Sequence, residues 1–264
     1  MVDLQEQNWI NLFGQYESDS PGWFGTWTTY SPEKEVLKTF QGVRCFRANA
    51  NKTVVTHTNN YTYSDGSTSS KSWTLEKESC SQPDGVIHPA LPTSMRAIYL
   101  SPDATAVVSQ KRESDLSLGA ELFFYYEDQR TSIIPIYNEQ GQLEKIFQIR
   151  EQWGHFPEHP PTETITQLSG SWRGEKRTIT PDLKCSEPEK IEDFSFDQTS
   201  DKNQLMSLPD GFFCYPQKSI KLGEPFQIKA GQLVSEQEYK QITVEYDYSG
   251  TFVSLIFEVL HRQS

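Results

Sequence analysis

Residues 119–151, GAELFFYYEDQRTSIIPIYNEQGQLEKIFQIRE, contain three runs of aromatic and β-branched residues separated by short polar turns. The runs cover residues 121–126, 131–137 and 143–151. Flat rings and branched side chains suit a pleated, half-buried surface, and short runs joined by tight turns are typical of antiparallel strands. The stretch therefore predicts an antiparallel meander, and the rest of the chain has to be compatible with it.

The same pattern extends toward the N-terminus, where one helical segment precedes it. Trp9, Leu12, Phe13 and Tyr16 recur at the spacing of a helix face and predict a short amphipathic helix. From Gly22 onward the apolar period changes to two, which indicates strands. Many short strands with short turns favour an all-β antiparallel barrel or sandwich. The further strands expected on this pattern cover residues 26–30, 36–47, 54–63, 71–77, 95–100 and 106–111.

A proline-rich segment, 153–163, follows the last of the strands. Proline cannot donate to a strand ladder, and it disfavours helix in the residue before it. We therefore expect a linker at this point of the chain. It would divide the protein into an N-terminal domain, 1–152, and a shorter C-terminal domain, 164–264.

Short motifs of the first domain return in the second in the same order and at a shrinking offset. An ordered series of this kind indicates an internal repeat of one structural unit. The second copy is shorter, and we expect its acidic stretch 187–193 to be a solvated loop, so a reduced second barrel is predicted. The matches pair Gly25-Thr-Trp27 with Gly170-Ser-Trp172, Pro83-Asp-Gly85 with Pro209-Asp-Gly211, 137–141 with 246–250, and 146–149 with 256–259.

Each copy begins with Gly-x-Trp and ends in a strand that carries an arginine. Glycine permits a tight turn into the floor of a barrel, and a tryptophan ring is large enough to fill that floor. A guanidinium from the last strand can lie across the ring and so close the last strand against the first. The residues expected in this structural role are Gly25, Trp27 and Arg150 in the first copy and Gly170, Trp172 and Arg262 in the second.

The Gly-x-Trp strand and the basic residue on the last strand resemble the lipocalin and wider calycin superfamily. The tandem arrangement is similar to a group of uncharacterised, largely cyanobacterial proteins, on the evidence of GAELFF at 119–124, Arg130 and IFQIRE at 146–151. The resemblance implies two tandem lipocalin-like β-barrels with a short N-terminal helix. The same superfamily includes lipocalin-like phycobiliprotein lyases, which deliver bilin chromophores to cysteines, so a bilin is one ligand that the resemblance suggests.

The formal net charge is −12, and a surface this acidic repels phosphate backbones and anionic lipid. We therefore expect neither nucleic acid nor a membrane as a partner, and the longest apolar run, 122–126, is too short to span a bilayer. The N-terminus has no apolar signal segment, which favours a cytoplasmic location. There the four cysteines should be reduced and buried, with one disulfide in each half as the alternative.

Catalytic signatures are lacking in the sequence, which contains no GxSxG, no glycine-rich phosphate loop, no HExxH and no CxxC. His155 and His159 have the spacing of two metal ligands on a helix, but the prolines beside them exclude a helix. His57 lies in an alternating strand, where a satisfied or solvated histidine is the better interpretation. We identify no catalytic residue, metal site or resident cofactor, and we favour a non-catalytic protein.

Glu121 opens an otherwise apolar strand, which makes it the most informative charged residue. It either lies on the outer face of the barrel or points inward and pairs with an arginine, because buried charges need partners. The arginines considered for this pairing are Arg96, Arg130 and Arg150. An inward Glu121 could also orient a ligand.

We expect a small hydrophobic or conjugated ligand in the first barrel, since an eight-stranded barrel is wide enough to hold one. Bilin-lyase activity is the first alternative, and a structural or protein-interaction module that uses the aromatic face of 121–126 is the second. A barrel filled by its own side chains is a further alternative. The residues predicted to contact the ligand are Tyr61, Tyr63, Trp73, Tyr99, Phe123, Tyr125, Glu121 and Arg130.

Overall fold

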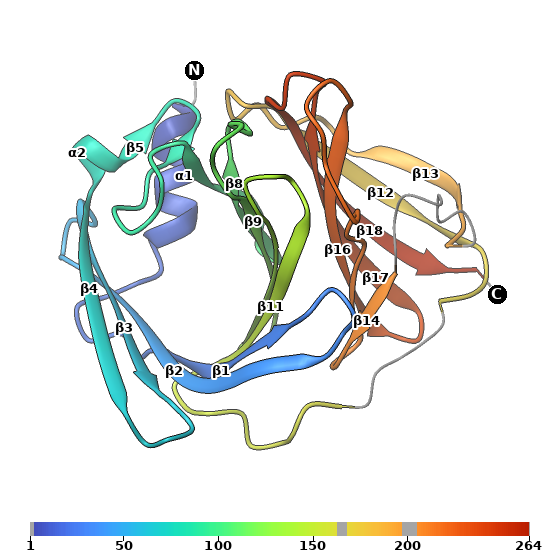
Figure 1. Cartoon of the computed structure of the whole chain (residues 1–264). Coiled ribbons are helices and arrows are strands. Elements are labelled where there is room, and N and C mark those ends of the chain that lie inside the picture. Colours follow the sequence, from blue (N-terminus) through green and yellow to red (C-terminus); the bar gives the residue numbers. More distant parts are fainter. Residues whose placement is uncertain (1–2, 163–167, 197–204, 264) are drawn as a thin grey trace. The chain divides into compact units, whose positions relative to one another are not determined.

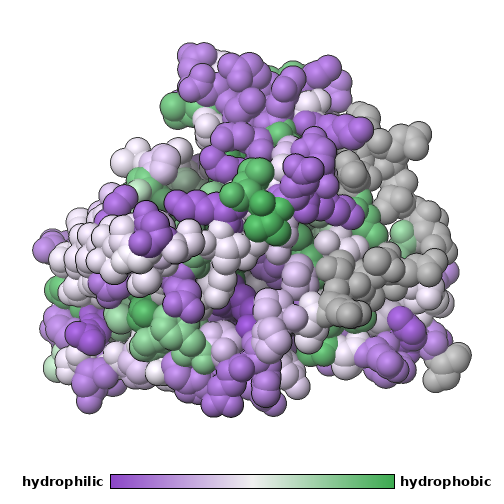
Figure 2. Space-filling view, turned by 60° about the horizontal axis from the view of Figure 1, so that its bottom comes forward, coloured by the Kyte–Doolittle hydropathy of each residue, from purple (hydrophilic) through white to green (hydrophobic). Residues whose placement is uncertain are grey.

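The computed structural model describes residues 3–162, 168–196 and 205–263. Two sheets and two short helices make up its regular structure, so the prediction of an all-β protein is confirmed (Figure 1). Figure 2 shows hydrophilic side chains over most of one face, with apolar side chains in small groups. Among the described residues, no helix is both long enough and apolar enough to cross a bilayer.

Eleven strands form the first sheet, which curls into a nearly closed barrel (Figure 1). Their order is β4-β3-β2-β1-β11-β10-β9-β8-β7-β6-β5, so the first strand pairs with the last, β11, as well as with β2. The bounds are β1 (Trp23–Tyr30), β2 (Val36–Ala48), β3 (Val54–Thr62), β4 (Thr68–Glu76), β5 (Ser81–Gln82), β6 (Gly85–Val86), β7 (Met95–Ser101), β8 (Ala104–Ser109), β9 (Leu118–Tyr126), β10 (Gln129–Tyr137) and β11 (Leu143–Trp153).

The gap between the edge strands of this sheet is filled by helix α1 (Leu4–Phe13) (Figure 1). The helix begins at Asp3, whose side chain accepts a hydrogen bond from the amide of Glu6 at 3.1 Å. Its buried face packs into one core with side chains from β3, β4 and β6. A second helix, α2 (Lys77–Cys80), connects β4 to β5. Apolar packing by α1 therefore joins two edges that no ladder hydrogen bonds connect.

The second sheet has seven strands in the order β13-β12-β18-β17-β16-β15-β14. A core of aromatic residues that includes Trp172, Phe213 and Tyr239 lies on it. That both sheets are lipocalin-like barrels stays a prediction. The bounds are β12 (Trp172–Ile179), β13 (Glu189–Phe194), β14 (Met206–Leu208), β15 (Phe212–Cys214), β16 (Phe226–Ser235), β17 (Glu238–Tyr246) and β18 (Phe252–Arg262).

The acidic stretch that was expected to be a loop contains strand β13. This prediction was wrong because β13 is an edge strand with most of its side chains in solvent, and charged residues are well tolerated at such an edge. The four cysteines carry free thiols, but only Cys80 and Cys214 are buried; Cys45 is half-buried and Cys185 is exposed. Of the expected linker, 153–163, the last residue lies outside the described residues.

The chain divides into two compact units, but not at a single point. The first unit contains Met1–Gln110, Glu121–Ile134 and Ile146–His159. The second contains Lys111–Ala120, Pro135–Lys145 and Pro160–Ser264. Strands β9, β10 and β11 thus contribute residues to both units. A proline-rich segment marks where the backbone leaves a sheet, but it does not reveal which core each residue of an earlier strand joins.

The first strands of the two sheets share a motif that is shifted from the one expected. Trp23 begins β1 and Trp172 begins β12, and each is followed two residues later by a glycine, Gly25 or Gly174. A Cβ atom at either glycine would overlap a backbone carbonyl oxygen of the facing strand, β11 or β18. The structural repeat is therefore Trp-x-Gly. Gly170, at a φ of +96°, lies in the turn before β12.

Candidate functional site

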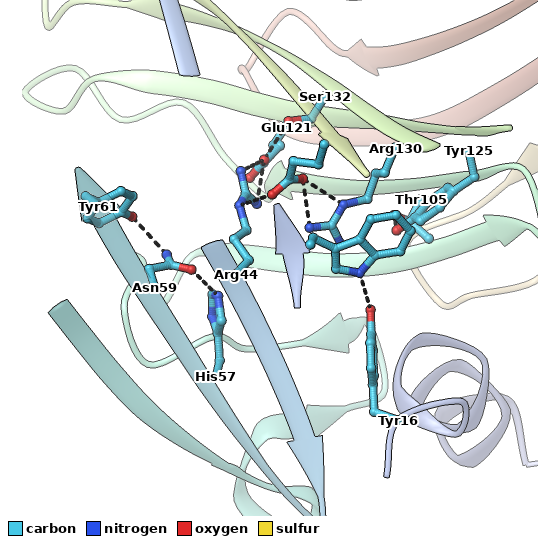
Figure 3. A network of polar contacts seen from close by, with 12 residues as sticks. Tyr16, Arg44, His57, Asn59, Tyr61, Thr105, Glu121, Tyr125, Arg130 and Ser132 are labelled. Atoms are coloured by element: carbon cyan, nitrogen blue, oxygen red, sulfur yellow. Dashed lines mark hydrogen bonds and ion pairs between the residues drawn. The ribbon is translucent and has the colours of Figure 1, made fainter. Parts of the chain in front are cut away.

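A cavity of about 260 Å³ lies within the first unit. Its apolar walls come from α1 and from rings and aliphatic side chains of the sheet, such as Trp27, Phe46 and Phe123. One wall is polar and combines charged groups with a row of hydrogen-bonded side chains (Figure 3). The lining residues with polar groups at this wall are Arg44, His57, Asn59, Tyr61, His88, Thr105, Glu121, Tyr125 and Arg130.

Six of the eight residues predicted to contact a ligand line this cavity. They are Tyr61, Trp73, Phe123, Tyr125, Glu121 and Arg130. Tyr63 lies beyond the end of β3, where its hydroxyl contacts Ser69 at 3.1 Å, and it is not among the lining residues. Tyr99 is not among them either; its backbone amide donates to the side chain of Asn8 at 2.9 Å.

Glu121 points inward, but its arginine partner is one that was not considered. Nη1 and Nη2 of Arg44 donate to Glu121 Oε1 at 3.1 and 3.0 Å, and Ser132 Oγ donates to the same oxygen at 2.8 Å (Figure 3). Of the candidates, Arg96 pairs with Asp84, and Arg150 donates to the backbone carbonyl of His159. The partner of an inward carboxylate depends on which strand faces it across the barrel, and the sequence does not contain that information.

Arg130 and Arg44 share a second carboxylate, that of Glu151, whose side chain is fully buried. Glu151 Oε2 accepts a hydrogen bond from Nε of Arg130 at 2.8 Å and lies 2.8 Å from Nη2 of the same guanidinium, and Glu151 Oε1 lies 3.2 Å from Nε of Arg44. With Glu121, the cluster contains two cations and two anions. The charged wall of the cavity is therefore electrically neutral and paired within itself.

Both guanidinium groups also lie over tryptophan rings of β1. Arg130 lies 4.4 Å from the Trp23 ring centroid and Arg44 lies 5.2 Å from that of Trp27. Burial by itself would lower their pKa values, but the nearby carboxylates, Glu151 first, raise the pKa of both arginines above the usual value. In the second unit Arg262 lies 4.9 Å from the Trp172 ring, the pairing that the sequence suggested.

A row of hydrogen bonds runs along β3 beside this cluster (Figure 3). Nδ1 of His57 lies 2.7 Å from Nε2 of His88, and Nε2 of His57 lies 2.8 Å from Oδ1 of Asn59. Asn59 Nδ2 donates to the Tyr61 hydroxyl at 2.9 Å, and the amide of Ala90 donates to Nδ1 of His88 at 3.0 Å. Burial lowers the pKa of His57 to about 2 and that of His88 to about 4, so both imidazoles are neutral at physiological pH.

Sequence reasoning missed Arg44, Glu151, Asn59 and His88 as parts of the site. A signal for Asn59 existed, because His57, Asn59 and Tyr61 alternate along one strand and so share a face. His88 lies after β6, outside any strand or helix, and no periodicity could have placed it against His57. Across the described residues, no three His, Cys, Asp or Glu side chains gather in a way that could hold a metal ion.

Fold and site together define an all-β protein whose nearly closed first sheet encloses an electrically neutral cavity of ligand size. The chain belongs to the DUF3598 family: the family described as "Domain of unknown function (DUF3598), N-terminal" matches residues 5–156. Residues 190–263 match a second family, "Biogenesis factor required for ATP synthase 1, C-terminal domain". A search of curated proteins gave no match.

Among solved structures, a DUF3598 protein of unknown function from Nostoc punctiforme is similar over nearly the whole length. It is 20% identical, the match covers 97% of this chain and 99% of that one, and the TM-score is 0.72, which shows a shared fold. A putative AttH from Nitrosomonas europaea (10% identity, 93% of each chain) has a TM-score of 0.22, too low to bear on the fold. Membership of a family of unknown function is thus confirmed, whereas the cyanobacterial type and the likeness to lipocalins and bilin lyases stay predictions.

Proposed function

We propose that the first unit binds a small, uncharged, largely apolar molecule in its cavity and does not transform it chemically. The observation that carries this proposal is the self-paired charge cluster of Arg44, Arg130, Glu121 and Glu151. Because each charge already has an opposite partner, the wall offers no net charge to a ligand. A charged ligand would have to break a buried ion pair, which is costly.

Size and chemistry of the remaining wall support an aromatic or conjugated ligand. A volume of about 260 Å³ lies just below the range of roughly 300–1,000 Å³ typical of ligand sites, so only a small ligand fits. Rings such as Trp27, Trp73 and Phe123 line the cavity, and aromatic faces pack well against one another. A ligand of two or three rings suits this space.

The titratable groups of the cavity support binding rather than catalysis. His57 and His88 have pKa values far below neutral pH and are hydrogen-bonded to each other, so neither is poised to exchange protons with a ligand. A bilin is less well supported than an uncharged ligand, because its propionate groups would need arginines that Glu121 and Glu151 already neutralise.

Two fluorescent probes with the same ring skeleton test the proposal. We expect N-phenylnaphthylamine, which is uncharged, to bind with increased emission, and anilinonaphthalene sulfonate, which is anionic, to bind at least tenfold more weakly. Ala90 is an exposed residue at the lining of the cavity, so Ala90→Trp should block binding without unfolding the protein. Thr93→Trp, at an exposed position that does not line the cavity, is the matched control. Equal binding of both probes, or binding unaffected by Ala90→Trp, would count against this function.

A second candidate function, protein–protein contact through the second unit, is favoured by the match of residues 190–263 to the C-terminal domain of a biogenesis factor required for ATP synthase. In this unit Leu222 and Tyr248 are 45% and 71% exposed, and they lie on turns joined by a hydrogen bond from the amide of Gly223 to the Tyr248 carbonyl. If they form a contact, Leu222→Ser/Tyr248→Ser should abolish recovery of a specific partner from host lysate. Val36→Ser/Leu37→Ser, at exposed positions of the first unit, should retain it. Identical recovery with both variants would contradict this candidate.

A further inference from the structure

One backbone group determines which side chains donate and which accept in the row of hydrogen bonds on β3. The amide of Ala90 can only donate, so Nδ1 of His88 must present its lone pair, and the proton of this neutral imidazole lies on Nε2. That N–H therefore donates to Nδ1 of His57, which leaves the proton of His57 on its own Nε2. Both tautomers follow from one backbone contact.

The same direction continues to the end of the row. His57 Nε2–H donates to Oδ1 of Asn59, so the amide of Asn59 has its NH₂ group turned toward Tyr61 and donates to that hydroxyl oxygen. The hydroxyl of Tyr61 is thus an acceptor within the row, and its own O–H is left over. Among the residues that the structure describes, no acceptor for this O–H is found.

The O–H of Tyr61, which has no acceptor in the row, belongs to a side chain that lines the cavity and is fixed by its neighbours. The ring of Tyr61 makes edge contacts with Trp27 and Phe40, with centroid distances of 5.7 and 5.6 Å. Burial raises the pKa of Tyr61, so the hydroxyl keeps its proton at neutral pH. Tyr16 also lines the cavity, and its hydroxyl oxygen accepts a hydrogen bond from the indole N–H of Trp23 at 3.3 Å.

The row positions the donor and does not move a proton. A neutral carboxamide passes no proton from one of its sides to the other, so Asn59 interrupts any relay between the histidines and Tyr61. The Asn59 amide occupies one side of the Tyr61 hydroxyl oxygen as a donor, so the hydroxyl hydrogen of Tyr61 points away from Asn59.

We propose that the ligand of this cavity carries a carbonyl group, or an equivalent uncharged acceptor, which accepts a hydrogen bond from Tyr61. This inference rests on the proposed binding function and specifies its ligand class as aromatic or conjugated ketones, aldehydes, esters or amides. Tyr61 is half-buried, and a ligand in the cavity would cover its hydroxyl. A donor that is covered and left unsatisfied is costly, so a ligand without an acceptor binds less well. The site thereby distinguishes ligands of the same shape by a single atom.

Two ligands of nearly identical shape test the inference. β-Acetylnaphthalene has a carbonyl where β-isopropenylnaphthalene has C=CH₂, and their affinities can be compared by displacement of N-phenylnaphthylamine. One net hydrogen bond predicts that wild-type protein prefers the ketone by about 3- to 10-fold. Tyr61→Phe removes the donor and should abolish this preference, and the affinity for the hydrocarbon should not fall, because no donor is then left unsatisfied.

Asn59→Asp provides an independent variant. A carboxylate can only accept, so the O–H of Tyr61 would turn to residue 59, and the ketone preference should again be lost although the tyrosine is intact. Tyr63→Phe, the same change at the next tyrosine and outside the cavity lining, is the control and should keep the preference. Circular dichroism and thermal melting verify that each variant is folded.

The outcomes separate this inference from the function on which it rests. If wild-type protein binds both ligands equally, the cavity binds apolar molecules as proposed and the role of Tyr61 is refuted. If the ketone preference survives in Tyr61→Phe, the donor is some other group and the inference fails. If neither ligand displaces the probe, both proposals fail together.

Discussion

Glu151→Gln removes one of the two carboxylates that neutralise Arg44 and Arg130, while it leaves the shape of the side chain almost unchanged. Glu151 is fully buried and Arg130 is 3% exposed, so water cannot replace the lost charge. In the variant, Glu121 is the one carboxylate left in a cluster with two guanidinium groups. The tryptophan rings beneath these groups contribute in wild type and variant alike and do not offset the loss.

The expected loss of unfolding free energy in Glu151→Gln follows from the burial of the Glu151–Arg130 ion pair. Removal of one partner from a buried ion pair typically destabilises a protein by about 3–5 kcal/mol, and because glutamine retains one acceptor we expect about 3 kcal/mol. For a protein of this size, that corresponds to a fall of roughly 6–12 °C in the melting temperature of the first unit. Arg130→Met in the same background should recover part of the loss, because no uncompensated charge then remains at that position.

Urea denaturation followed by tryptophan fluorescence measures the change, because Trp23 and Trp27 lie in the same unit as the cluster. The matched control is Glu144→Gln on the same strand, where Glu144 Oε1 pairs with Lys145 at 2.8 Å but is 46% exposed. Exposed pairs contribute at most about 1 kcal/mol. If Glu151→Gln and Glu144→Gln destabilise the protein equally, the buried cluster is not the charge-balanced unit described above.

Three further perturbations have defined outcomes. The pKa values of His57 and His88, about 2 and about 4, lie below the unfolded value near 6.5, so the unfolded chain binds protons first as the pH falls. The free energy of unfolding should therefore decrease from pH 6.5 to pH 5 by up to about 1.4 kcal/mol per pH unit for each histidine, and His57→Gln/His88→Gln should flatten this slope in urea titrations. Gly25→Ala places a methyl group against a backbone carbonyl of β11 and should cost roughly 1–3 kcal/mol, measured by thermal melting; an unchanged melting temperature would contradict the close approach. Trp9→Ala should cost about 3–5 kcal/mol and weaken N-phenylnaphthylamine binding, because Trp9 is 1% exposed in the core between α1 and the sheet; a variant as stable as wild type would argue against that role of the helix.

Much of the first sheet follows from local pattern. Alternation alone placed Tyr61 on one face of its strand and predicted that Phe123 and Tyr125 share a face, because successive side chains of a strand point to opposite sides. The same reasoning identified Glu121 as unusual, since a charge at the start of an apolar strand needs an explanation. These predictions needed no knowledge of how strands distant in sequence pair.

The predictions that failed concerned contacts between distant parts of the chain. Arg44 pairs with Glu121 because β2 and β9 face each other across the barrel, and His88 meets His57 from a segment without regular structure. The repeated motif was predicted as Gly-x-Trp, whereas the structure repeats Trp-x-Gly. The two motifs overlap in the first strand, WFGTW, and only the close approach of Gly25 to β11 distinguishes them. Pair partners and backbone clearances belong to tertiary structure, and a single sequence contains no direct signal for either.

The seam filled by α1 has a mechanical consequence for the barrel. In a fully closed barrel, ladder hydrogen bonds fix the circumference, so that any widening breaks bonds along a whole strand. Here β4 and β5 are tethered at one end through α2, and α1 packs at this seam with apolar side chains and with side-chain hydrogen bonds such as that from Gln5 Nε2 to the Ser81 carbonyl at 2.7 Å. Widening of the barrel at this seam therefore breaks no ladder hydrogen bond. For the ligand binding proposed above, this predicts that molecules of somewhat different width fit one cavity while every ladder bond of the wall stays in place.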